Sequence, residues 1–163
     1  MVYIIGAGPG DPELITVKGQ RLLKEADVII YAGSLVNPAL LDYAKADCEI
    51  YNSASMTLGE VIETITAAEQ EGKMTVRLHT GDPAIYGAIQ EQMDELSRRN
   101  IEYTVIPGVS SFLATAAALK QEYTLPEISQ TVIITRNEGR TPVPEKEKIK
   151  IFSKLIKLLC VFS

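Results

Sequence analysis

The sequence is poor in the residues that build metal sites and disulfide frameworks. Its 163 residues include two cysteines, Cys48 and Cys160, and one histidine, His79. Two cysteines are too few for a disulfide scaffold, and their spacing is not that of metal ligands. We therefore expect reduced thiols and no metal ion.

Long apolar runs and an excess of positive charge are also missing. No stretch reaches the roughly 18 apolar residues that a membrane-spanning helix requires. The first residues, Met1–Gly6, lack the basic start and long apolar region of a signal peptide. The formal net charge is −5, whereas nucleic-acid-binding domains usually carry a basic face. These absences predict a cytoplasmic protein that has neither a membrane nor a nucleic acid as its partner.

The chain is 46% hydrophobic, and its apolar residues alternate between strand-like and helix-like spacing. The predicted strands are Val2–Ile5, Asp27–Tyr31, Glu49–Tyr51, Met74–Leu78 and Tyr103–Ile106. The predicted helices are Glu13–Glu25, Asn37–Ala46, a helix from the capping box at Thr57 and Glu60 to Gly72, Pro83–Arg99, and one that starts at Ser110 or Ser111. This alternation predicts an α/β fold with an open parallel sheet of about five strands and helices on both faces.

A second unit is predicted after a linker. Residues 1–121 form the expected N-terminal α/β domain, 122–130 the linker, and 131–163 the start of a truncated C-terminal α/β domain. Thr131–Thr135 and Cys160–Ser163 have the composition of strands, and Lys148–Leu159 that of an amphipathic helix. So few elements are too small to close a core of their own.

Glycine-rich loops follow three of the predicted strands: Gly6–Pro12, His79–Pro83 and Pro107–Ser111. Two of them contain Gly-Asp-Pro, in which the aspartate suits a helix cap and the proline a first helical position. The carboxyl ends of parallel strands meet at the edge where open α/β sheets bind ligands. The three loops should therefore converge on one cleft.

The first loop is an incomplete match to a dinucleotide-binding fingerprint. The match stops at Gly6 and Gly8, and Asp11 stands where a third small residue is needed. Its negative charge would repel a pyrophosphate at the helix N-terminus. No Gly-Lys-Ser/Thr follows, which excludes a P-loop. The three loops therefore suit a cofactor with ribose hydroxyls, an amine and a cationic centre. The alternative is a turn that only reverses the chain.

Several candidate residues have a second, purely structural interpretation. Asp82 is either a plain helix cap or a ligand contact, and the two roles are compatible. His79 is a possible base or a structural residue. Arg136 and Arg140 could pair with an anionic substrate or simply be solvated.

Taken together, these motifs resemble the tetrapyrrole methylase family of S-adenosylmethionine-dependent enzymes. The resemblance depends on three segments: Gly6–Pro12 with Leu14–Thr16, Gly81–Pro83 with Tyr86–Gly87, and Pro107–Ser111. Three further segments are similar to one branch, which methylates precorrin-4 or cobalt-precorrin-4 at ring carbon 11 in cobalamin biosynthesis. They are Tyr31–Pro38, Asn52–Met56 and Thr135–Pro144.

This resemblance implies two α/β domains, a homodimer, a tetrapyrrole substrate and S-adenosylmethionine as the methyl donor, which leaves as S-adenosylhomocysteine. The implied cofactor-binding residues are Pro9, Thr80, Gly81, Asp82, Ile85, Ser110 and Ser111. The implied substrate-binding residues are Gly8, Gly10, Asp11, Arg136 and Arg140. Ala32 and Asn52 stand where uroporphyrinogen-methylating relatives carry an acidic base and a lysine, so the catalytic base is unknown. Methylation of RNA or protein, and a fragment that only binds ligand or dimerises, are the alternatives.

Overall fold

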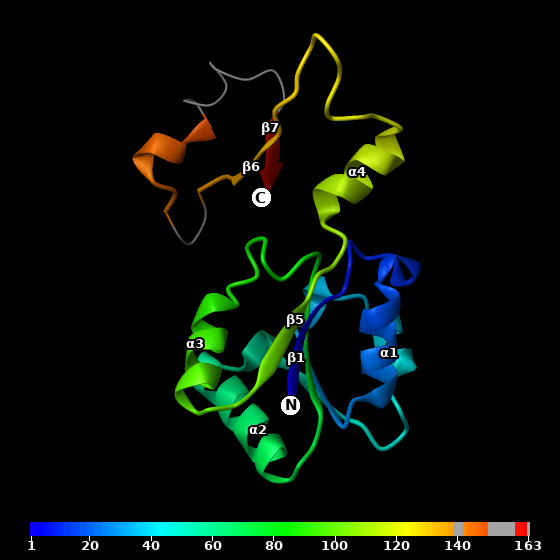
Figure 1. The fold of residues 1–163 in the computed structure, drawn as a ribbon, viewed down its shortest axis with the longest axis vertical. Helices are drawn as coiled ribbons and strands as arrows, with labels where there is room; N and C mark the ends of the chain where they lie inside the picture. The colour runs from blue at the N-terminus through cyan, green and yellow to red at the C-terminus, as the bar shows by residue number, and fades with distance from the viewer. Residues whose placement is uncertain (139–141, 150–158, 163) are drawn as a thin grey trace. The chain divides into compact units, whose positions relative to one another are not determined.

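The structure is a computed structural model that describes residues 1–138, 142–149 and 159–162. The chain divides into two compact units, Met1–Ser111 and Phe112–Ser163 (Figure 1). The domain boundaries expected from the sequence stay a prediction.

A five-stranded parallel sheet forms the centre of the first unit. Its strand order is β3-β2-β4-β1-β5, and each strand runs parallel to its neighbours. The strands are β1 (Val2–Gly6), β2 (Val28–Tyr31), β3 (Glu49–Asn52), β4 (Thr75–His79) and β5 (Tyr103–Ile106). The predicted α/β class, the parallel sheet and its size are therefore confirmed.

Helices cover both faces of this sheet (Figure 1). On one face, α1 (Val17–Glu25) contributes to a buried cluster that contains Leu22, Leu23, Ile5, Ile29, Val76 and Leu78. On the other face, α2 (Leu58–Gln70) and α3 (Gln90–Arg98) contribute to a second cluster that contains Val61, Ile62, Ile65, Leu96, Val28 and Ile30. Neighbouring residues of β2 belong to different clusters because successive side chains of a strand point to opposite faces.

The start of α2 is the capping box predicted from the sequence. Thr57 Oγ1 accepts a hydrogen bond from the Glu60 N–H at 3.3 Å, and Glu60 Oε2 accepts one from the Thr57 N–H at 2.6 Å. The helix is followed by Gly72 at φ +71°, a backbone conformation that glycine adopts without a steric penalty.

The predicted helix over Glu13–Glu25 is wrong in its first turn. A short 3₁₀ helix, η1 (Pro12–Leu14), is followed by Ile15 and Thr16 in extended conformations, and α1 begins only at Val17. Thr16 caps α1 by accepting a hydrogen bond from the Gly19 N–H at 3.1 Å. Asp11 and Thr16 are both caps in the structure, and each starts a helix of its own. The helix predicted over Asn37–Ala46 is likewise a 3₁₀ helix, η3 (Pro38–Tyr43).

The helix predicted over Pro83–Arg99 also begins later than expected. Tyr86 and Ala88 have positive φ angles of 58° and 49°, which no right-handed helix accommodates. Residues 83–86 form turns instead, and α3 begins at Gln90.

The helix α4 (Ser111–Leu119) begins at the last residue of the first unit, and its other residues belong to the second unit. The second unit also contains the strands β6 (Ile133–Arg136) and β7 (Leu159–Phe162), which pair in parallel. Both predicted strands are therefore present. The helix predicted over Lys148–Leu159 falls largely on 150–158, outside the described residues. Within the part of the chain that the structure describes, no helix is both long and apolar enough to cross a membrane.

Asp27 connects three strands at the amino edge of the sheet. Its carboxylate accepts hydrogen bonds from Lys45 Nζ at 2.5 Å and from the Met74 N–H at 2.6 Å. Its backbone C=O accepts one from the Glu49 N–H at 2.9 Å. The Lys45 ammonium, followed by the Met74 amide, holds the pKa of Asp27 below its usual range. The folded state therefore favours the ionised carboxylate.

This pKa shift makes stability depend on pH. A carboxyl with a lowered folded-state pKa contributes stability above its unfolded pKa of about 3.9, and that stability is lost as the pH falls through the folded pKa. We expect Asp27→Asn to lower the free energy of unfolding at pH 7, and the difference from wild type to shrink below about pH 4. Urea unfolding between pH 7 and about pH 3 measures the free energy of unfolding of the variant and of wild type at each pH. The control is Asp42→Asn, which removes an exposed carboxylate. A difference that is constant with pH would contradict the assignment.

Candidate active site

The candidate site lies where three neighbouring strands of the first unit end. β1 pairs with β4 on one side and β5 on the other, so the loops that follow these strands emerge at the same carboxyl edge. Open α/β sheets bind ligands at this edge. The segments are residues 7–11, 80–89 and 107–110.

The first two loops are joined by backbone hydrogen bonds. The Gly81 N–H donates to the Gly8 C=O at 2.8 Å, and the Gly8 N–H donates to the Gly81 C=O at 3.3 Å. The Ala7 N–H donates to the C=O of His79 at 2.6 Å. Gly8 and Gly81 have φ angles of +80° and +57°, a region in which a β-carbon is strained. The predicted convergence of these loops is confirmed.

Three glycines bring the backbones of all three loops into close contact. A Cβ on Gly6 would lie 2.5 Å from the Gly81 carbonyl oxygen and 2.6 Å from Gly108 Cα. A Cβ on Gly108 would lie 2.1 Å from the same oxygen and 2.8 Å from Gly6 Cα. Since carbon atoms pack best at about 3.5–4.0 Å, only glycine fits at these two positions.

Asp82 links the second loop to the third. Its Oδ1 accepts a hydrogen bond from the Ala84 N–H at 2.8 Å, and its Oδ2 accepts one from the Gly108 N–H at 3.0 Å. The residue is therefore a cap of the turn and also a bridge between two loops. A carboxylate oxygen has a second lone pair, so both oxygens keep the capacity to accept one more hydrogen bond.

The residues expected to bind the cofactor lie on these loops with different exposures. Thr80 and Ser111 are exposed, Pro9, Gly81, Asp82 and Ile85 are half-buried, and Ser110 is buried. The loops contain hydroxyls, glycine backbone and the Asp82 carboxylate, and neither lysine nor arginine. This donor set fits a nucleoside with hydroxyls, an amine and a positive centre better than a polyphosphate.

The first loop is held in place by Asn37, which the sequence indicated only as the start of a helix. Asn37 Nδ2 donates a hydrogen bond to the Gly10 C=O at 2.7 Å. Among the expected substrate contacts, Gly8 is buried, Gly10 and Asp11 are exposed, and Asp11 caps η1 through the Glu13 N–H. The Asn-Pro pair indicated a helix start, but nothing in it identified this contact.

His79 is buried and electrically neutral. It is 5% exposed, and its Nε2 atom has no hydrogen-bond partner among the described residues. Burial, followed by the positive charge of Arg77, lowers the pKa of His79 to about 3. So weak a base abstracts protons poorly near pH 7, which favours the structural interpretation of this histidine.

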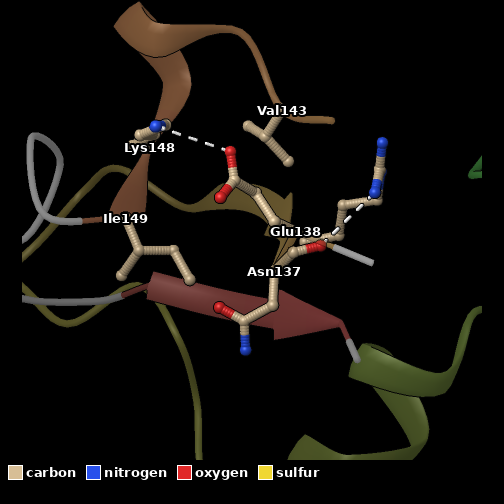
Figure 2. A pocket seen from close by; sticks show the side chains of 6 residues that line it. Asn137, Glu138, Val143, Lys148 and Ile149 are labelled. Atoms are coloured by element: carbon tan, nitrogen blue, oxygen red, sulfur yellow. Dashed lines mark hydrogen bonds and ion pairs between the residues drawn. The ribbon is translucent and has the colours of Figure 1, made fainter. Parts of the chain in front are cut away.

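Arg136 belongs to the second unit, where it lines a pocket of about 410 Å³ with Asn137, Glu138, Val143, Lys148 and Ile149. Its guanidinium donates hydrogen bonds to the backbone C=O groups of Asn137 and Pro142. Figure 2 shows Lys148 directed at the Glu138 carboxylate, at 3.5 Å. Arg140 lies outside the described residues. Within the described chain, no group of three His, Cys, Asp or Glu residues has the arrangement of a metal site.

The first unit is an open parallel α/β domain whose glycine-rich loops meet at the carboxyl edge of the sheet. The family model described as Tetrapyrrole (Corrin/Porphyrin) Methylases matches residues 1–159. The chain therefore belongs to the tetrapyrrole methylase family, and the resemblance seen in the sequence is confirmed.

Several curated relatives are similar over nearly the whole chain. The cobalt-precorrin-4 C(11)-methyltransferase of Methanocaldococcus jannaschii is 62% identical over 161 residues, which are 99% of this chain and 62% of that protein. The precorrin-4 C(11)-methyltransferase of Pseudomonas aeruginosa is 50% identical over 148 residues, covering 91% and 59%. The chain thus spans about three fifths of the length of the curated relatives it matches.

Solved structures have the same fold. A cobalt precorrin-4 methyltransferase of cobalamin biosynthesis superposes with a TM-score of 0.91 at 54% identity, covering 94% of this chain and 64% of that one. The uroporphyrin-III C-methyl transferase of Thermus thermophilus, complexed with S-adenosylhomocysteine, has a TM-score of 0.72 at 31% identity, covering 89% and 59%.

Proposed function

We propose that this protein is an S-adenosylmethionine-dependent methyltransferase of cobalamin biosynthesis that methylates precorrin-4 or cobalt-precorrin-4 at ring carbon 11. The observation that carries the proposal is the joining of the loops after β1, β4 and β5 by the Gly8–Gly81 and Asp82–Gly108 hydrogen bonds. The names of the relatives with 50–62% identity support the reaction. The Methanocaldococcus jannaschii relative and the solved structure at 54% identity are both named for the cobalt-containing substrate, which favours that form.

The same edge would hold the methyl donor. The proposed contacts are Pro9, Thr80, Gly81, Asp82, Ile85, Ser110 and Ser111. Hydroxyls and backbone groups suit ribose and amine groups, and the Asp82 carboxylate suits a positive centre. The Thermus relative that contains S-adenosylhomocysteine supports this choice of donor.

Bound S-adenosylmethionine supplies a methyl group on a sulfonium, which is already activated toward a carbon nucleophile. The chain's own contribution is to hold the donor and acceptor in line and to keep water out. The positive charge of the donor disappears during the reaction, so the negative charge of Asp82 favours donor binding more than turnover. Ala32 and Asn52 offer no acid–base group, and neutral His79 is a weak base, so we assign no general base.

The tetrapyrrole would meet the first loop at Gly8, Gly10 and Asp11. Its carboxylates would pair with Arg136 and Arg140, because guanidinium groups bind carboxylates in a two-pronged geometry. We also propose that the protein acts as a homodimer in the cytoplasm.

The decisive experiment combines a binding titration with an activity assay. We expect S-adenosylhomocysteine to bind this chain in calorimetry, and labelled S-adenosylmethionine to methylate cobalt-precorrin-4, with precorrin-4 compared in parallel. Labelling of RNA or protein in place of the corrins would contradict the proposed substrate. Donor binding without any methyl transfer would support the alternative of a ligand-binding fragment, and absence of donor binding would contradict the proposed function.

A further inference from the structure

Strand β4 carries a buried column of polar residues. Thr75, Arg77 and His79 are 1%, 7% and 5% exposed, and they alternate with Val76 and Leu78, which belong to the apolar cluster on the α1 side. The polar column therefore faces α2 and α3. Strands of parallel sheets are usually apolar on both faces, so a guanidinium in this position requires an explanation.

Arg77 connects β2, β4 and α3 through hydrogen bonds. Its Nη1 donates to the Ile30 C=O at 3.0 Å, and its Nε donates to Gln92 Oε1 at 3.1 Å. Gln92 Nε2 in turn donates to the Ala88 C=O at 3.2 Å. The result is a continuous path from the sheet to the turn that precedes α3.

That turn has an unfavourable backbone. Tyr86 and Ala88 have φ angles of 58° and 49°, and a Cβ on Gly87 would lie 2.1 Å from the Pro83 carbonyl oxygen. Backbone conformations of this kind persist when the surrounding structure enforces them, and they gather at functional sites. The turn directly follows Ile85, one of the proposed cofactor contacts.

The hydrogen bonds at position 77 require the planar geometry of a guanidinium group. Within the described part of the chain, no carboxylate forms an ion pair with Arg77, and burial lowers its pKa to about 10. The side chain is therefore charged at neutral pH and oriented by two uncharged acceptors. A planar guanidinium donates in two fixed directions at once, whereas a lysine ammonium is a compact point charge.

We propose that Arg77, acting through Gln92, is a positioning residue that holds the turn 86–88 in place at the cofactor-binding edge. Its effect on the donor rests on the proposed function, whereas its effect on the turn does not. A pocket of about 200 Å³ adjoins Arg77, Ala88 and Gln92.

Hydrogen exchange of the ligand-free chain tests the effect on the turn. Arg77→Met and Gln92→Met remove the hydrogen bonds and keep apolar bulk. We therefore expect the Met93 N–H, which donates to the Ile89 C=O at 2.9 Å where the turn enters α3, to exchange about tenfold faster in both variants. Amides of α2 should be unchanged. The control is Thr75→Val on the same face of β4, which removes a buried hydroxyl that has no partner among the described residues. Wild-type exchange of the Met93 N–H in both Met variants would overturn the proposal.

Calorimetry with S-adenosylhomocysteine tests the effect on the donor. We expect Arg77→Met and Gln92→Met to weaken the affinity about tenfold, Arg77→Lys to weaken it less, and Thr75→Val to leave it unchanged. Faster exchange together with wild-type affinity would overturn the positioning role. A wild-type chain that binds no S-adenosylhomocysteine would overturn the proposed function, and the exchange data would still decide whether Arg77 holds the turn.

Discussion

Gly108→Ala is expected to destabilise the first unit by about 3 kcal/mol or more, at the upper end of the usual cost of overpacking. The added Cβ would lie 2.1 Å from the Gly81 carbonyl oxygen and 2.8 Å from Gly6 Cα. Both neighbours are backbone atoms at the ends of hydrogen-bonded strands, so a side-chain rotation cannot relieve the contact. The three loops would have to separate, and donor binding should be lost with them.

Urea unfolding followed by circular dichroism measures this effect, because the chain contains no tryptophan for fluorescence. Gly59→Ala is the matched control. Its Cβ would meet only Thr57 Oγ1, at 3.8 Å, and Gly59 is the second residue of α2, where the stabilisation that alanine brings to a helix interior does not apply in full. The same substitution should therefore leave stability within about 0.5 kcal/mol of wild type at Gly59 and destabilise the first unit at Gly108. A Gly108→Ala protein with wild-type stability and donor affinity would show that the loops are not in close contact.

The fold could be predicted from the sequence because local patterns and topology agree. Apolar segments such as Tyr103–Ile106 have the bounds of the observed strand, and the capping box at Thr57 starts α2 as expected. Parallel strands have their carboxyl ends on one edge by geometry, so the alternation of strand and helix placed the three loops on a common edge. Their direct contact also requires β1 to lie between β4 and β5, an order that the alternation does not specify.

What the sequence did not reveal depends on contacts between distant residues. Asp82-Pro83 is typical of a helix start. Tyr86 and Ala88 nevertheless have left-handed backbone conformations, so α3 begins only at Gln90. The hydrogen bonds from Arg77 through Gln92 to this turn come from another strand and from the next helix, so no local pattern reveals them. The charged residue within the apolar strand Val76–Leu78 was the one available signal.

The candidate site divides in the same way. Glycines and hydroxyls indicated where a ligand could bind, since these residue types are visible in the loops themselves. Gly6 and Gly108 must both be glycine because each lies against the backbone of the other, and only the three-dimensional structure shows this contact. The same holds for Asp82, whose cap was predicted and whose second hydrogen bond, to the Gly108 N–H, was not.

Replacing Asp82 is the second change with a large expected effect. Asp82→Ala removes the acceptors of two backbone N–H groups, those of Ala84 and Gly108. Hydrogen bonds to a charged group are worth about 1.5–3 kcal/mol each, and the exposed Ala84 amide can bind water instead. We therefore expect a loss of about 2–3 kcal/mol of stability, and donor affinity at least about tenfold weaker, because the second and third loops are no longer joined and the negative charge is gone.

Asp82→Asn removes the charge and one of the two acceptor oxygens at nearly constant size. An asparagine has one acceptor oxygen and one NH₂ group, so its NH₂ group would face the N–H of either Ala84 or Gly108, and that hydrogen bond would be lost. Asparagine should therefore resemble alanine in stability and in S-adenosylhomocysteine affinity, although it is nearly the same size as aspartate. Asp11→Ala is the control, because Asp11 is exposed and accepts a single hydrogen bond, from the Glu13 N–H, and its loss should cost about 1 kcal/mol. If Asp82→Asn binds S-adenosylhomocysteine like wild type and is as stable, Asp82 does not join the two loops in solution, and the proposed donor site loses the contact that connects its second and third segments.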